Sequence, residues 1–407
     1  MKILMINTTC TYGSTGAIVS ILRDVLTKSG HVVSVCYGWN NQLPTPPNSY
    51  RLTFKGEGLI SSKFGYYTGF YGHANILSTL KLKFLIRKIK PDVIHLFNLH
   101  ATYINDLEVL RFIKVRKIPV LYTMFDEYPY MGRCCFSYDC EKFTTFCNDC
   151  AHLNDYPSSL YFDRSSYYFN KKREIYKDFS KLTFIGCSAV YNRAKSSALL
   201  KNSRVQLIEE PIDYDNIYYP RSSSEMRERL GIPENNKVVL TITDYGDVRK
   251  GGKYFFELYD LMKNLPQYSF VYVGYDDHKY GEKEGIITIP YVSDKGELAV
   301  YYSMADVFVF TSLADTSPNT VQQALGCGSP VCAFNIDGIR SMKLDDANVI
   351  RLSDVEDIEK LKLNVLDFER KDKLTISRCR ESVYNKYNVT DVCKKYLILY
   401  KELENSL

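Results

Sequence analysis

Residues 311–334 read TSLADTSPNTVQQALGCGSPVCAF, and this stretch decides the fold class of the chain. An apolar run at 307–310 precedes it and is short enough to be one buried strand. Polar turn residues follow at 314–319, and a helical run at 320–325 ends at two glycines. A second apolar run occupies 331–334. This order of strand, loop, helix and strand predicts the βαβ unit of a parallel sheet.

The loop of this βαβ unit is a candidate anion site. Ligands bind such sheets outside the carboxyl ends of the strands, where residues 314–319 lie. Pro318 fixes the backbone at the start of the helix. We therefore expect free amides to be available to hold an anion at Asn319, Thr320 and Val321. The alternative, a plain βαβ unit with a polar loop, stays open on these residues alone.

Length and composition bound the class of protein. A chain of 407 residues exceeds one ordinary core, which predicts two domains. A hydrophobic content of 45% and a charged content of 24% are typical of a soluble globular protein. The net charge of +5 favours anionic ligands or headgroups only weakly and does not indicate nucleic acid. Residues 1–6 turn polar at Asn7, too soon for a signal-peptide core, so we expect a cytoplasmic protein.

The N-terminus predicts a second anion site. Residues 1–8 form a strand, a glycine-rich turn follows, and 17–28 form a helix. A helix N-terminus after such a turn can bind a phosphate-sized anion, although the G-x-G-x-x-G dinucleotide spacing is missing. The residues of the turn are Gly13, Ser14, Thr15 and Gly16.

Two further segments of the first half bear on structure and location. Residues 41–72 have the composition of a loop, rich in Pro, Tyr and Gly. Residues 76–90 predict an amphipathic helix that stops before Pro91. Its basic part, Lys81 to Lys90, suits an encounter with a membrane surface, and a solvated helix face is the alternative.

Five of the twelve cysteines fall within seventeen residues. Thiolates at this density suit tetrahedral zinc, and the last two have the tight-pair spacing of such sites. Cys135 is the extra one. The sequence leaves open a structural zinc or reduced, buried thiols, and no His-Glu pair argues for a catalytic metal. The candidate ligands are Cys134, Cys140, Cys147 and Cys150.

The second half begins a new series with an apolar strand at 238–242. Arg249 and Lys250 follow it, beside Gly251, at a loop-to-helix junction. Two cations at such a junction can bind a diphosphate through charge-assisted hydrogen bonds. A solvated basic turn is the alternative.

Taken together, these motifs resemble the family 4 glycosyltransferases, retaining enzymes of the GT-B fold. The donor motif of that family is an acidic residue, seven residues, then Glu and Ala, and a Cys-Gly-Thr-Pro-Val-like turn. In this chain the frame is Asp315, seven residues, Gln323 and a similar turn at 327–331. The first acid is thus shortened and the second is replaced by an amide.

The first half carries the family's other motifs in altered form. Family members have a His-Asn-x-His stretch and later a Thr-x-His-Asp stretch, where this chain has FNLH at 97–100 and TMFD at 123–126. Phe125 stands where the second motif has its His. A subset of the family has a cysteine-rich insert after this point, as here. The residues placed on the acceptor side are Asn98, His100 and Asp126.

The resemblance implies an α/β fold with two Rossmann-like parallel-sheet domains facing a cleft. It predicts an acceptor-side domain at 1–209, a donor-side domain at 210–390 and a C-terminal helix at 391–407 that crosses back onto the first domain. The glycine-rich turn at 13–16 would face the cleft.

The resemblance also implies roles in metal-independent sugar transfer. Arg249 and Lys250 would bind the departing diphosphate, Asp315 the sugar hydroxyls and Gln323 the ribose; we take the first three as catalytic. The further donor-binding candidates are Gly13, Ser14, Thr15, Gly16, Thr243, Gly274, Tyr291, Val292, Pro318, Asn319 and Thr320.

Three functions stay open from the sequence. The first is a glycosyltransferase that uses a UDP-, GDP- or ADP-linked sugar and a glycan or lipid-linked acceptor. Its pathway would be polysaccharide biosynthesis of the capsule, O-antigen or exopolysaccharide type, at the inner face of the plasma membrane. The second is a non-catalytic relative that binds a nucleotide sugar, and the third is a nicotinamide enzyme. We favour the first because the retained residues are those that bind the leaving group.

Overall fold

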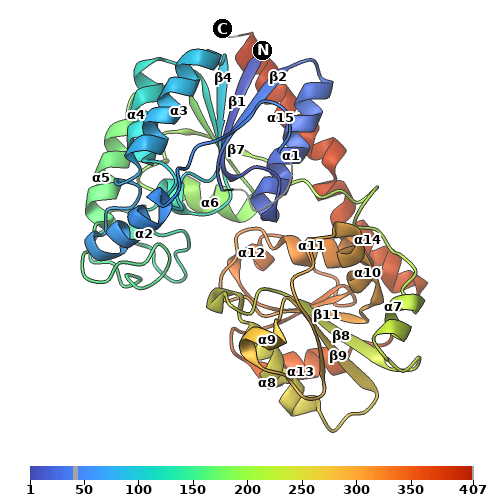
Figure 1. Cartoon of the computed structure of the whole chain (residues 1–407). Helices are drawn as coiled ribbons and strands as arrows, with labels where there is room; N and C mark the ends of the chain where they lie inside the picture. The colour runs from blue at the N-terminus through green and yellow to red at the C-terminus, as the bar shows by residue number, and fades with distance from the viewer. Residues whose placement is uncertain (40–44, 406–407) are drawn as a thin grey trace. The chain divides into compact units, whose positions relative to one another are not determined.

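A computed structural model describes residues 1–39 and 45–405 of the chain. The chain divides into two compact units (Figure 1). Unit 1 comprises Met1–Glu210 and Cys393–Leu407, and unit 2 comprises Pro211–Val392. Within the described residues, no helix is long and apolar enough to cross a membrane.

Unit 1 is built on a sheet of seven parallel strands in the order β3-β2-β1-β4-β5-β6-β7. The strands are β1 (Lys2–Thr9), β2 (Val32–Trp39), β3 (Ser49–Arg51), β4 (Val93–Leu96), β5 (Val120–Met124), β6 (Leu182–Gly186) and β7 (Arg204–Leu207). The helices are α1 (Gly13–Lys28), α2 (Glu57–Thr68), α3 (Ile76–Ile89), α4 (Asp106–Val115), α5 (Ser165–Tyr176), α6 (Ser188–Ser196) and, from Cys393 onward, α15 (Val389–Glu404). Short 3₁₀ turns are η1 (Tyr128–Tyr130) and η2 (Lys142–Thr144).

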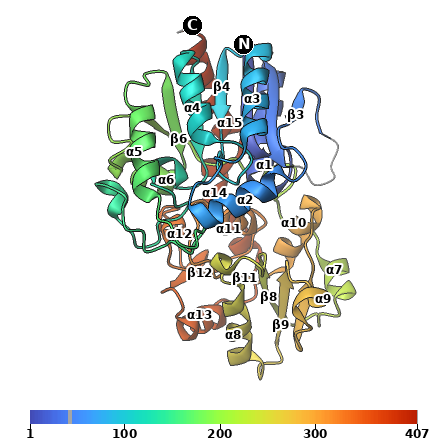
Figure 2. The same cartoon turned by 60° about the vertical axis from the view of Figure 1, so that its left-hand side comes forward.

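The sheet of unit 1 is covered on both faces, which explains its apolar strands. Residues 3–6 of β1 are fully buried, as are 93 to 96 of β4. A parallel sheet needs such cover because its crossover helices lie on both faces. Helices α3, α4 and α5 cover one face, and α1 and α15 cover the other (Figures 1 and 2).

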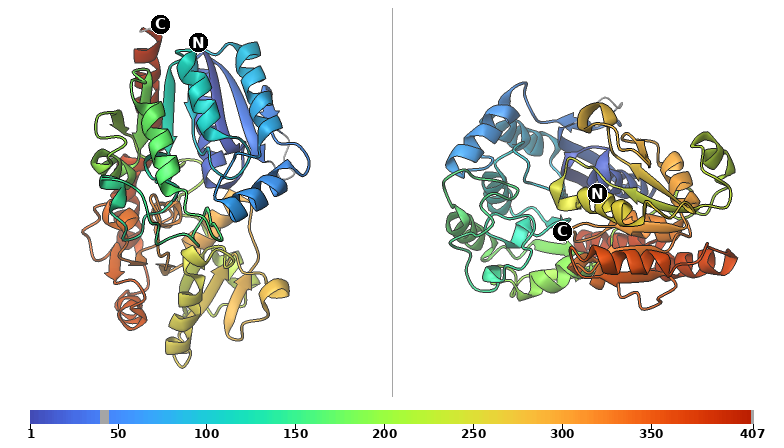
Figure 3. Two further views of the ribbon diagram at one scale, coloured as in Figure 1. Left: turned by 90° about the vertical axis from the view of Figure 1, so that its left-hand side faces the viewer. Right: turned by 90° about the horizontal axis from the view of Figure 1, so that it is seen from below.

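One buried polar group ties the C-terminal helix to the sheet of unit 1. His95 on β4 is fully buried. Its Nδ1 lies 2.6 Å from the Tyr400 hydroxyl of α15, and its Nε2 lies 2.8 Å from Thr123 Oγ1 on β5. Helix α15 ends beside the start of β1, where the Met1 amino group lies 3.8 Å from Glu404 (Figure 3).

Unit 2 repeats the plan with six parallel strands in the order β10-β9-β8-β11-β12-β13. They are β8 (Lys237–Ile242), β9 (Tyr268–Val273), β10 (Ile286–Ile289), β11 (Val307–Phe310), β12 (Val331–Phe334) and β13 (Ile350–Ser353). Its helices are α7 (Ser224–Arg229), η3 (Val248–Lys250), α8 (Gly252–Met262), α9 (Asp277–Tyr280), α10 (Lys295–Met304), α11 (Asn319–Gly326), α12 (Asp337–Arg340), α13 (Ile358–Leu366) and α14 (Lys373–Tyr387). Numbered along the chain, this strand order is 3-2-1-4-5-6, the doubly wound arrangement whose switch point lies between β8 and β11.

The prediction of a loop at 41–72 is wrong for most of its described part. Residues 41–44 lie outside the described residues, and the remainder contains β3 and helix α2. The buried face of α2 consists of Glu57, Gly58, Ser61 and Gly65, so the helix lacks the large buried apolar residues of an ordinary amphipathic helix. Its glycines allow close packing instead: a Cβ at Gly58 would lie 2.0 Å from the Trp39 ring, and one at Gly65 2.8 Å from the Tyr71 ring.

The predicted turn at 13–16 is also wrong, because α1 begins at Gly13. Gly13 adopts a φ of +69°, which a residue with a side chain rarely adopts, and the helix follows directly. Gly16 lies in the first turn of the helix, where a Cβ would come within 2.6 Å of Thr9 Oγ1. Gly16 therefore allows the start of α1 to pack tightly against the end of β1.

His95 makes the stability of the protein pH-dependent. Burial lowers the pKa of His95 to about 3, well below its value in the unfolded chain. The unfolded state therefore binds the extra proton as pH falls from about 6.5 toward 3, and stability present above pH 6.5 is lost. Between pH 7 and pH 4 we expect a loss of about 3 kcal/mol from this residue, or roughly 6–12 °C in Tm.

The measurement compares thermal midpoints of the wild type and His95→Gln across pH 4 to 7. The variant should show a flatter dependence, because Gln cannot titrate. Equal slopes in the two proteins would contradict the assignment. Tyr291→Phe, at an exposed position in unit 2, is the control and should follow the wild type.

Candidate active site

The loops that follow β8 and β11 meet at the switch point of unit 2. The two strands are hydrogen-bonded neighbours, with Leu240 paired to Phe308. Beyond their carboxyl ends, Lys250 Nζ lies 2.6 Å from Asp315 Oδ2. The Leu313 amide donates to the Arg249 carbonyl at 2.8 Å. Two residues chosen from separate motifs are thus brought into one ion pair.

The Lys250–Asp315 ion pair is partly shielded from water. The Asp315 side chain is 12% exposed and that of Lys250 is 29% exposed. Burial alone would raise the pKa of Asp315, but the Lys250 ammonium, with a smaller contribution from Arg249, outweighs it and lowers that pKa. The second oxygen, Oδ1, accepts from the Ser317 amide at 3.1 Å. Both carboxylate oxygens therefore have partners within the protein, which the sequence did not lead us to expect.

Arg249 is also engaged by the protein. Its guanidinium donates to the Ala314 carbonyl at 2.7 Å and to Asp247 Oδ2 at 2.9 Å. Asp247 additionally caps η3 by accepting from the Arg249 amide at 3.1 Å. Asp247 is a site residue that we did not predict, although an Asp immediately before a helical turn is a recognisable cap signal. Arg249 and Lys250 are therefore both held in place by contacts with the loops that follow β8 and β11.

Further predicted donor residues lie beyond the ends of β8, β9 and β10. Gly274 follows β9 with a φ of +101°, and a Cβ there would lie 2.1 Å from the Thr243 carbonyl oxygen. Thr243 Oγ1 is buried and has no hydrogen-bond partner among the described residues. A buried hydroxyl without a partner is costly, which makes it a candidate to bind a ligand. Tyr291 and Val292 follow β10, and the Tyr291 side chain is 76% exposed.

The expected free amides at the start of α11 are largely occupied. Pro318 caps the helix, and the Asn319 amide donates to the Ser317 carbonyl at 2.8 Å. The Val321 amide donates to the Pro318 carbonyl at 2.9 Å. The prediction is therefore wrong for these two amides, because the tight turn around Pro318 uses them, and Thr320 remains as the candidate.

Gln323 has a hydrogen-bond partner that no sequence motif predicts. Its Oε1 accepts a hydrogen bond from the Tyr302 hydroxyl at 3.0 Å. Tyr302 lies on α10, which packs beside α11. The amide that replaces the family's Glu is thus oriented by a buried tyrosine.

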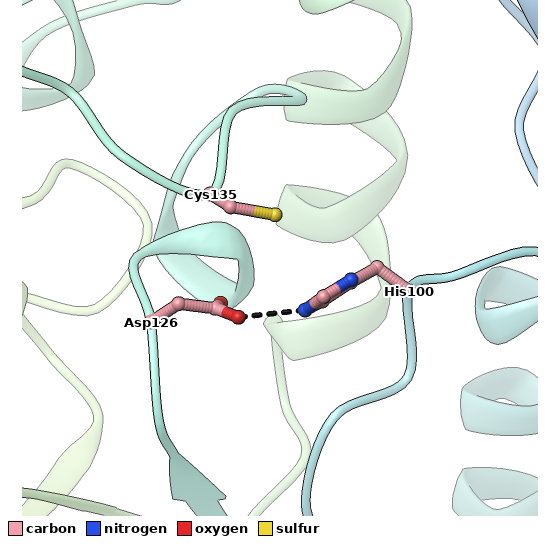
Figure 4. Close-up of side chains that lie close together, drawn as sticks. All are labelled: His100, Asp126 and Cys135. Atoms are coloured by element: carbon pink, nitrogen blue, oxygen red, sulfur yellow. Dashed lines mark hydrogen bonds and ion pairs between the residues drawn. The ribbon is translucent and has the colours of Figure 1, made fainter. Parts of the chain in front are cut away.

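The acceptor-side candidates lie in unit 1, beyond the ends of β4 and β5. His100 Nε2 lies 2.6 Å from Asp126 Oδ2, and His100 Nδ1 lies 3.2 Å from the Tyr156 hydroxyl. Cys135 joins them, since potential ligand atoms of all three side chains lie within 4.8 Å of one another (Figure 4). Asn98 lies in the loop after β4, where its carbonyl accepts a hydrogen bond from the Tyr103 hydroxyl at 2.7 Å, and no contact joins it to this cluster among the described residues.

The charge state of His100 follows from its neighbours. Burial favours the neutral imidazole, but Cys135 and Asp126 favour the protonated form and raise the pKa of His100 well above its usual value. Protonated His100 is a hydrogen-bond donor. Phe125, at the position of the family's motif His, stacks on Phe97 with ring centroids 5.6 Å apart.

A small cavity adjoins His100. It is lined by Tyr71, Gly72, Leu99, His100, Ala101, Thr102, Ile104, Asp106, Tyr128 and Pro157. Ala101 and Thr102 both adopt positive φ angles, of 76° and 52°. Strained backbone of this kind is concentrated at functional sites. The cavity therefore marks the loop after β4 as part of the candidate site of unit 1.

Two of the four candidate zinc ligands in the cysteine-rich segment lie close together. The sulfurs of Cys134 and Cys150 lie 3.7 Å apart, close to the roughly 3.8 Å between ligands of a tetrahedral site with Zn–S bonds of about 2.3 Å. A hydrogen bond from Cys134 lowers the pKa of Cys150 to about 6 and so favours the metal-binding thiolate. The Gly132 amide donates to Cys147 Sγ at 3.3 Å. Within the described residues, however, the group of three or more ligands within 4.8 Å is the His100 cluster, not these cysteines.

Known proteins of the same architecture identify the fold. Sucrose-phosphate synthase from Thermosynechococcus elongatus matches with a TM-score of 0.69 at 17% identity, over 100% of both chains. Anabaena HepE in complex with UDP-glucose matches with a TM-score of 0.67 at 13% identity, over 99% of this chain and 100% of that chain. The protein therefore has the two-domain, Rossmann-like GT-B fold of glycosyltransferases, as predicted.

Sequence comparison finds a family match within unit 2. Residues 222–385 match the family described as glycosyl transferases group 1. WcaC of Escherichia coli (strain K12), named for colanic acid biosynthesis, is 26% identical over 272 residues. That alignment covers 63% of this chain and 63% of WcaC, so the chain spans less than two thirds of this curated relative.

The Lys250–Asp315 ion pair should stabilise unit 2 in a pH-dependent way. In Lys250→Met the buried carboxylate loses its cation, which should destabilise by about 2 kcal/mol, or roughly 4–8 °C in Tm, at pH 7. Burial then raises the pKa of Asp315, so the loss should shrink as pH falls toward 4 and the carboxyl is protonated.

A double-mutant cycle with Asp315→Asn tests the pair by thermal unfolding at both pH values. Lys250→Met/Asp315→Asn should recover most of the lost midpoint, because no buried charge is left unpaired. Additive losses in the double variant would show that the two side chains do not interact.

Proposed function

We propose that this protein is a retaining glycosyltransferase that moves a sugar from a nucleotide-diphosphate donor to a glycan or lipid-linked acceptor in polysaccharide biosynthesis. The observation that carries the proposal is the Lys250–Asp315 pair at the switch point of the glycosyltransferase domain. Ligands of doubly wound sheets bind at this point. The UDP-glucose complex of HepE supports the donor class, and the colanic acid name of WcaC supports the pathway.

Lys250 and Arg249 would stabilise the leaving group. A diphosphate entering the switch point competes with Asp315 for the Lys250 ammonium, and Arg249 adds a second cation. As the bond from the sugar to the phosphate oxygen breaks, its electron pair leaves with the diphosphate, and fixed cations stabilise that charge. Asp315, released from Lys250, can then accept hydrogen bonds from sugar hydroxyls.

The acceptor proton would go to the departing phosphate. His100 is held protonated beside Asp126, so it donates hydrogen bonds and does not act as a base. Phe125 carries no proton-accepting group at the position of the motif His. The departing phosphate oxygen can take the proton of the acceptor hydroxyl while the new bond forms on the same face of the sugar.

A non-catalytic relative that binds a nucleotide sugar is the second candidate function. Two replacements favour it: Phe125 stacks on Phe97 where the family has His, and Gln323 is neutral where it has Glu. Both candidates require donor binding at unit 2, and turnover separates them.

We also propose that the cysteine-rich segment holds a structural zinc through Cys134, Cys140, Cys147 and Cys150. The segment from 131 to 163 has little regular structure beyond η2. Buried charges anchor it: Lys172 Nζ donates to the Met131 carbonyl at 3.0 Å, and Arg133 donates to the His152 carbonyl at 3.3 Å. A four-thiolate zinc would order such a segment without taking part in the chemistry.

Lys250 and Asp315 should have separable effects on donor binding and turnover. Lys250→Ala should slow sugar transfer by roughly 10²-fold or more, because its charge matters most as the phosphate departs. Asp315→Asn should weaken the intact sugar nucleotide and leave binding of the bare nucleoside diphosphate nearly unchanged.

Thermal shifts with UDP, GDP and ADP and their sugars identify the donor, since a ligand that binds only the native state stabilises it. Turnover with that donor is then measured for both variants. If Lys250→Ala binds the bare diphosphate normally and Asp315→Asn does not, the roles are reversed. A shift without turnover in the wild type would favour the binding protein, and no shift with any donor would contradict both functions.

The zinc proposal predicts about one zinc per chain in protein purified without chelators, by elemental analysis. Cys147→Ser should lose the metal, whereas the matched variant Cys135→Ser should retain it. Loss of zinc from Cys135→Ser alone would assign the metal to the His100 cluster instead. Less than about a tenth of an equivalent, with every cysteine titrating as a free thiol, would refute a metal in this segment.

A further inference from the structure

Exposed apolar side chains are concentrated on one part of unit 1. Among the described residues, 23 large hydrophobic side chains are exposed, and ten of them lie within residues 54–90. We call these ten the apolar patch. They are Phe54, Leu59, Ile60, Phe64, Tyr66, Tyr67, Ile76, Leu77, Leu80 and Phe84. Single exposed apolar residues need no explanation, but a concentration in a tenth of the chain marks an interaction surface.

The same segment concentrates positive charge. Residues 54–90 contain seven lysines and arginines and one glutamate, a net charge of +6, whereas the whole chain carries +5. The glutamate, Glu57, is buried. The remaining 370 residues together are therefore close to neutral, at −1.

Helices α2 and α3 hold this surface together through buried polar contacts. Glu57 at the start of α2 accepts from the Ser78 amide on α3 at 3.1 Å and also from the Ser78 hydroxyl. The Ser61 hydroxyl donates to Asn75, the N-cap of α3, at 2.5 Å. These hydrogen bonds join the N-terminal parts of the two helices. We therefore treat the exposed side chains of both helices as one surface. Both helices are labelled in Figure 2.

Each helix presents the patch as a stripe. On α2 the stripe is formed by Ile60, Phe64 and Tyr67, at spacings of four and then three residues. On α3 it is formed by Leu77, Leu80 and Phe84, at spacings of three and then four, and such spacings place side chains on one face of a helix. Lysines stand inside both stripes: Lys63 lies between Ile60 and Phe64, and Lys81 follows Leu80. The Lys81 ammonium also lies 5.1 Å from the centre of the Phe54 ring.

The lysines within the stripes decide what kind of partner the patch fits. The core of a protein–protein interface is depleted of lysine. A membrane interface accepts it, because the lysine stem can lie along apolar groups while the ammonium reaches anionic headgroups. Aromatic and aliphatic side chains beside Lys and Arg are typical of surfaces that lie in that interface.

We propose that the α2–α3 surface docks this protein onto a bilayer containing anionic lipids. The apolar patch enters the headgroup boundary, and its cations bind the lipid phosphates. The proposal does not rest on the glycosyltransferase function, since it needs only unit 1 and a vesicle.

Vesicle sedimentation of the full chain tests the proposal. The wild type should bind vesicles of phosphatidylcholine with 30% phosphatidylglycerol about tenfold or more tightly than pure phosphatidylcholine. Ile60→Ser/Leu77→Ser should weaken this binding about tenfold or more, because each buried methylene contributes to insertion. Lys63→Glu/Lys88→Glu should weaken it to a similar degree, and added salt should weaken the wild type.

Matched variants elsewhere serve as controls. Leu363→Ser/Leu374→Ser removes side chains of similar exposure from unit 2, and Lys195→Glu/Lys201→Glu changes the net charge by the same amount outside the patch. Both should bind within about threefold of the wild type, and thermal midpoints confirm that all variants fold.

Three results would overturn the proposal. The first is a wild type that binds neither vesicle, and the second is an equal loss in the control and patch variants. The third is a stable dimer in sedimentation velocity that Ile60→Ser/Leu77→Ser converts to monomer, which would show that a second copy covers the patch.

Discussion

A parallel sheet must be covered on both faces, and the rest of this protein follows from that constraint. The strands leave no polar face, so residues such as Ile3 and Val309 are fully buried. Polar groups gather instead beyond the carboxyl ends of the strands, where the crossovers diverge at the switch point. In unit 2 the Lys250–Asp315 pair occupies that position between β8 and β11. The position of the candidate site is therefore set by strand order, which brings together residues from separate motifs.

The sequence predicts those elements whose signal is local. The runs at 307–310 and 331–334 are apolar, short and bounded by turn residues, and they are strands β11 and β12. Helix α2 is not predicted in this way, because it is stabilised by contacts with residues distant in sequence. The Trp39 ring packs where Gly58 has no side chain, and this pairing cannot be read from either residue alone. The glycines at 13–16 are typical of a turn, but Gly13 instead starts α1 directly with a φ of +69°.

In the candidate site, too, local features are predictable from the sequence and contacts between distant segments are not. Lys250 and Asp315 were each selected from the sequence, but 65 positions separate them and their ion pair depends on β8 and β11 being neighbours. The amides of α11 were expected to be free, yet the turn around Pro318 uses two of them. Asp247 and Tyr302 orient Arg249 and Gln323, and Tyr302 is brought there by the packing of α10. The residue types at the site can be predicted from the sequence. The hydrogen bonds and ion pairs between them cannot, because they depend on which elements pack together.

The proposed acceptor site and the proposed lipid-binding surface of unit 1 meet in the connection between α2 and α3. Tyr71 and Gly72 lie in that connection, and both line the cavity beside His100. A Cβ at Gly72 would come within 2.5 Å of the Ile104 carbonyl, so the connection is packed closely against the loop after β4. The surface proposed to enter the headgroup boundary is thus continuous with the loop that carries the candidate acceptor-side residues. If the patch docks on a bilayer, the cavity beside His100 would lie near the bilayer surface, where a lipid-linked acceptor is held. Docking on anionic lipid therefore favours the lipid-linked acceptor of the two acceptor classes proposed.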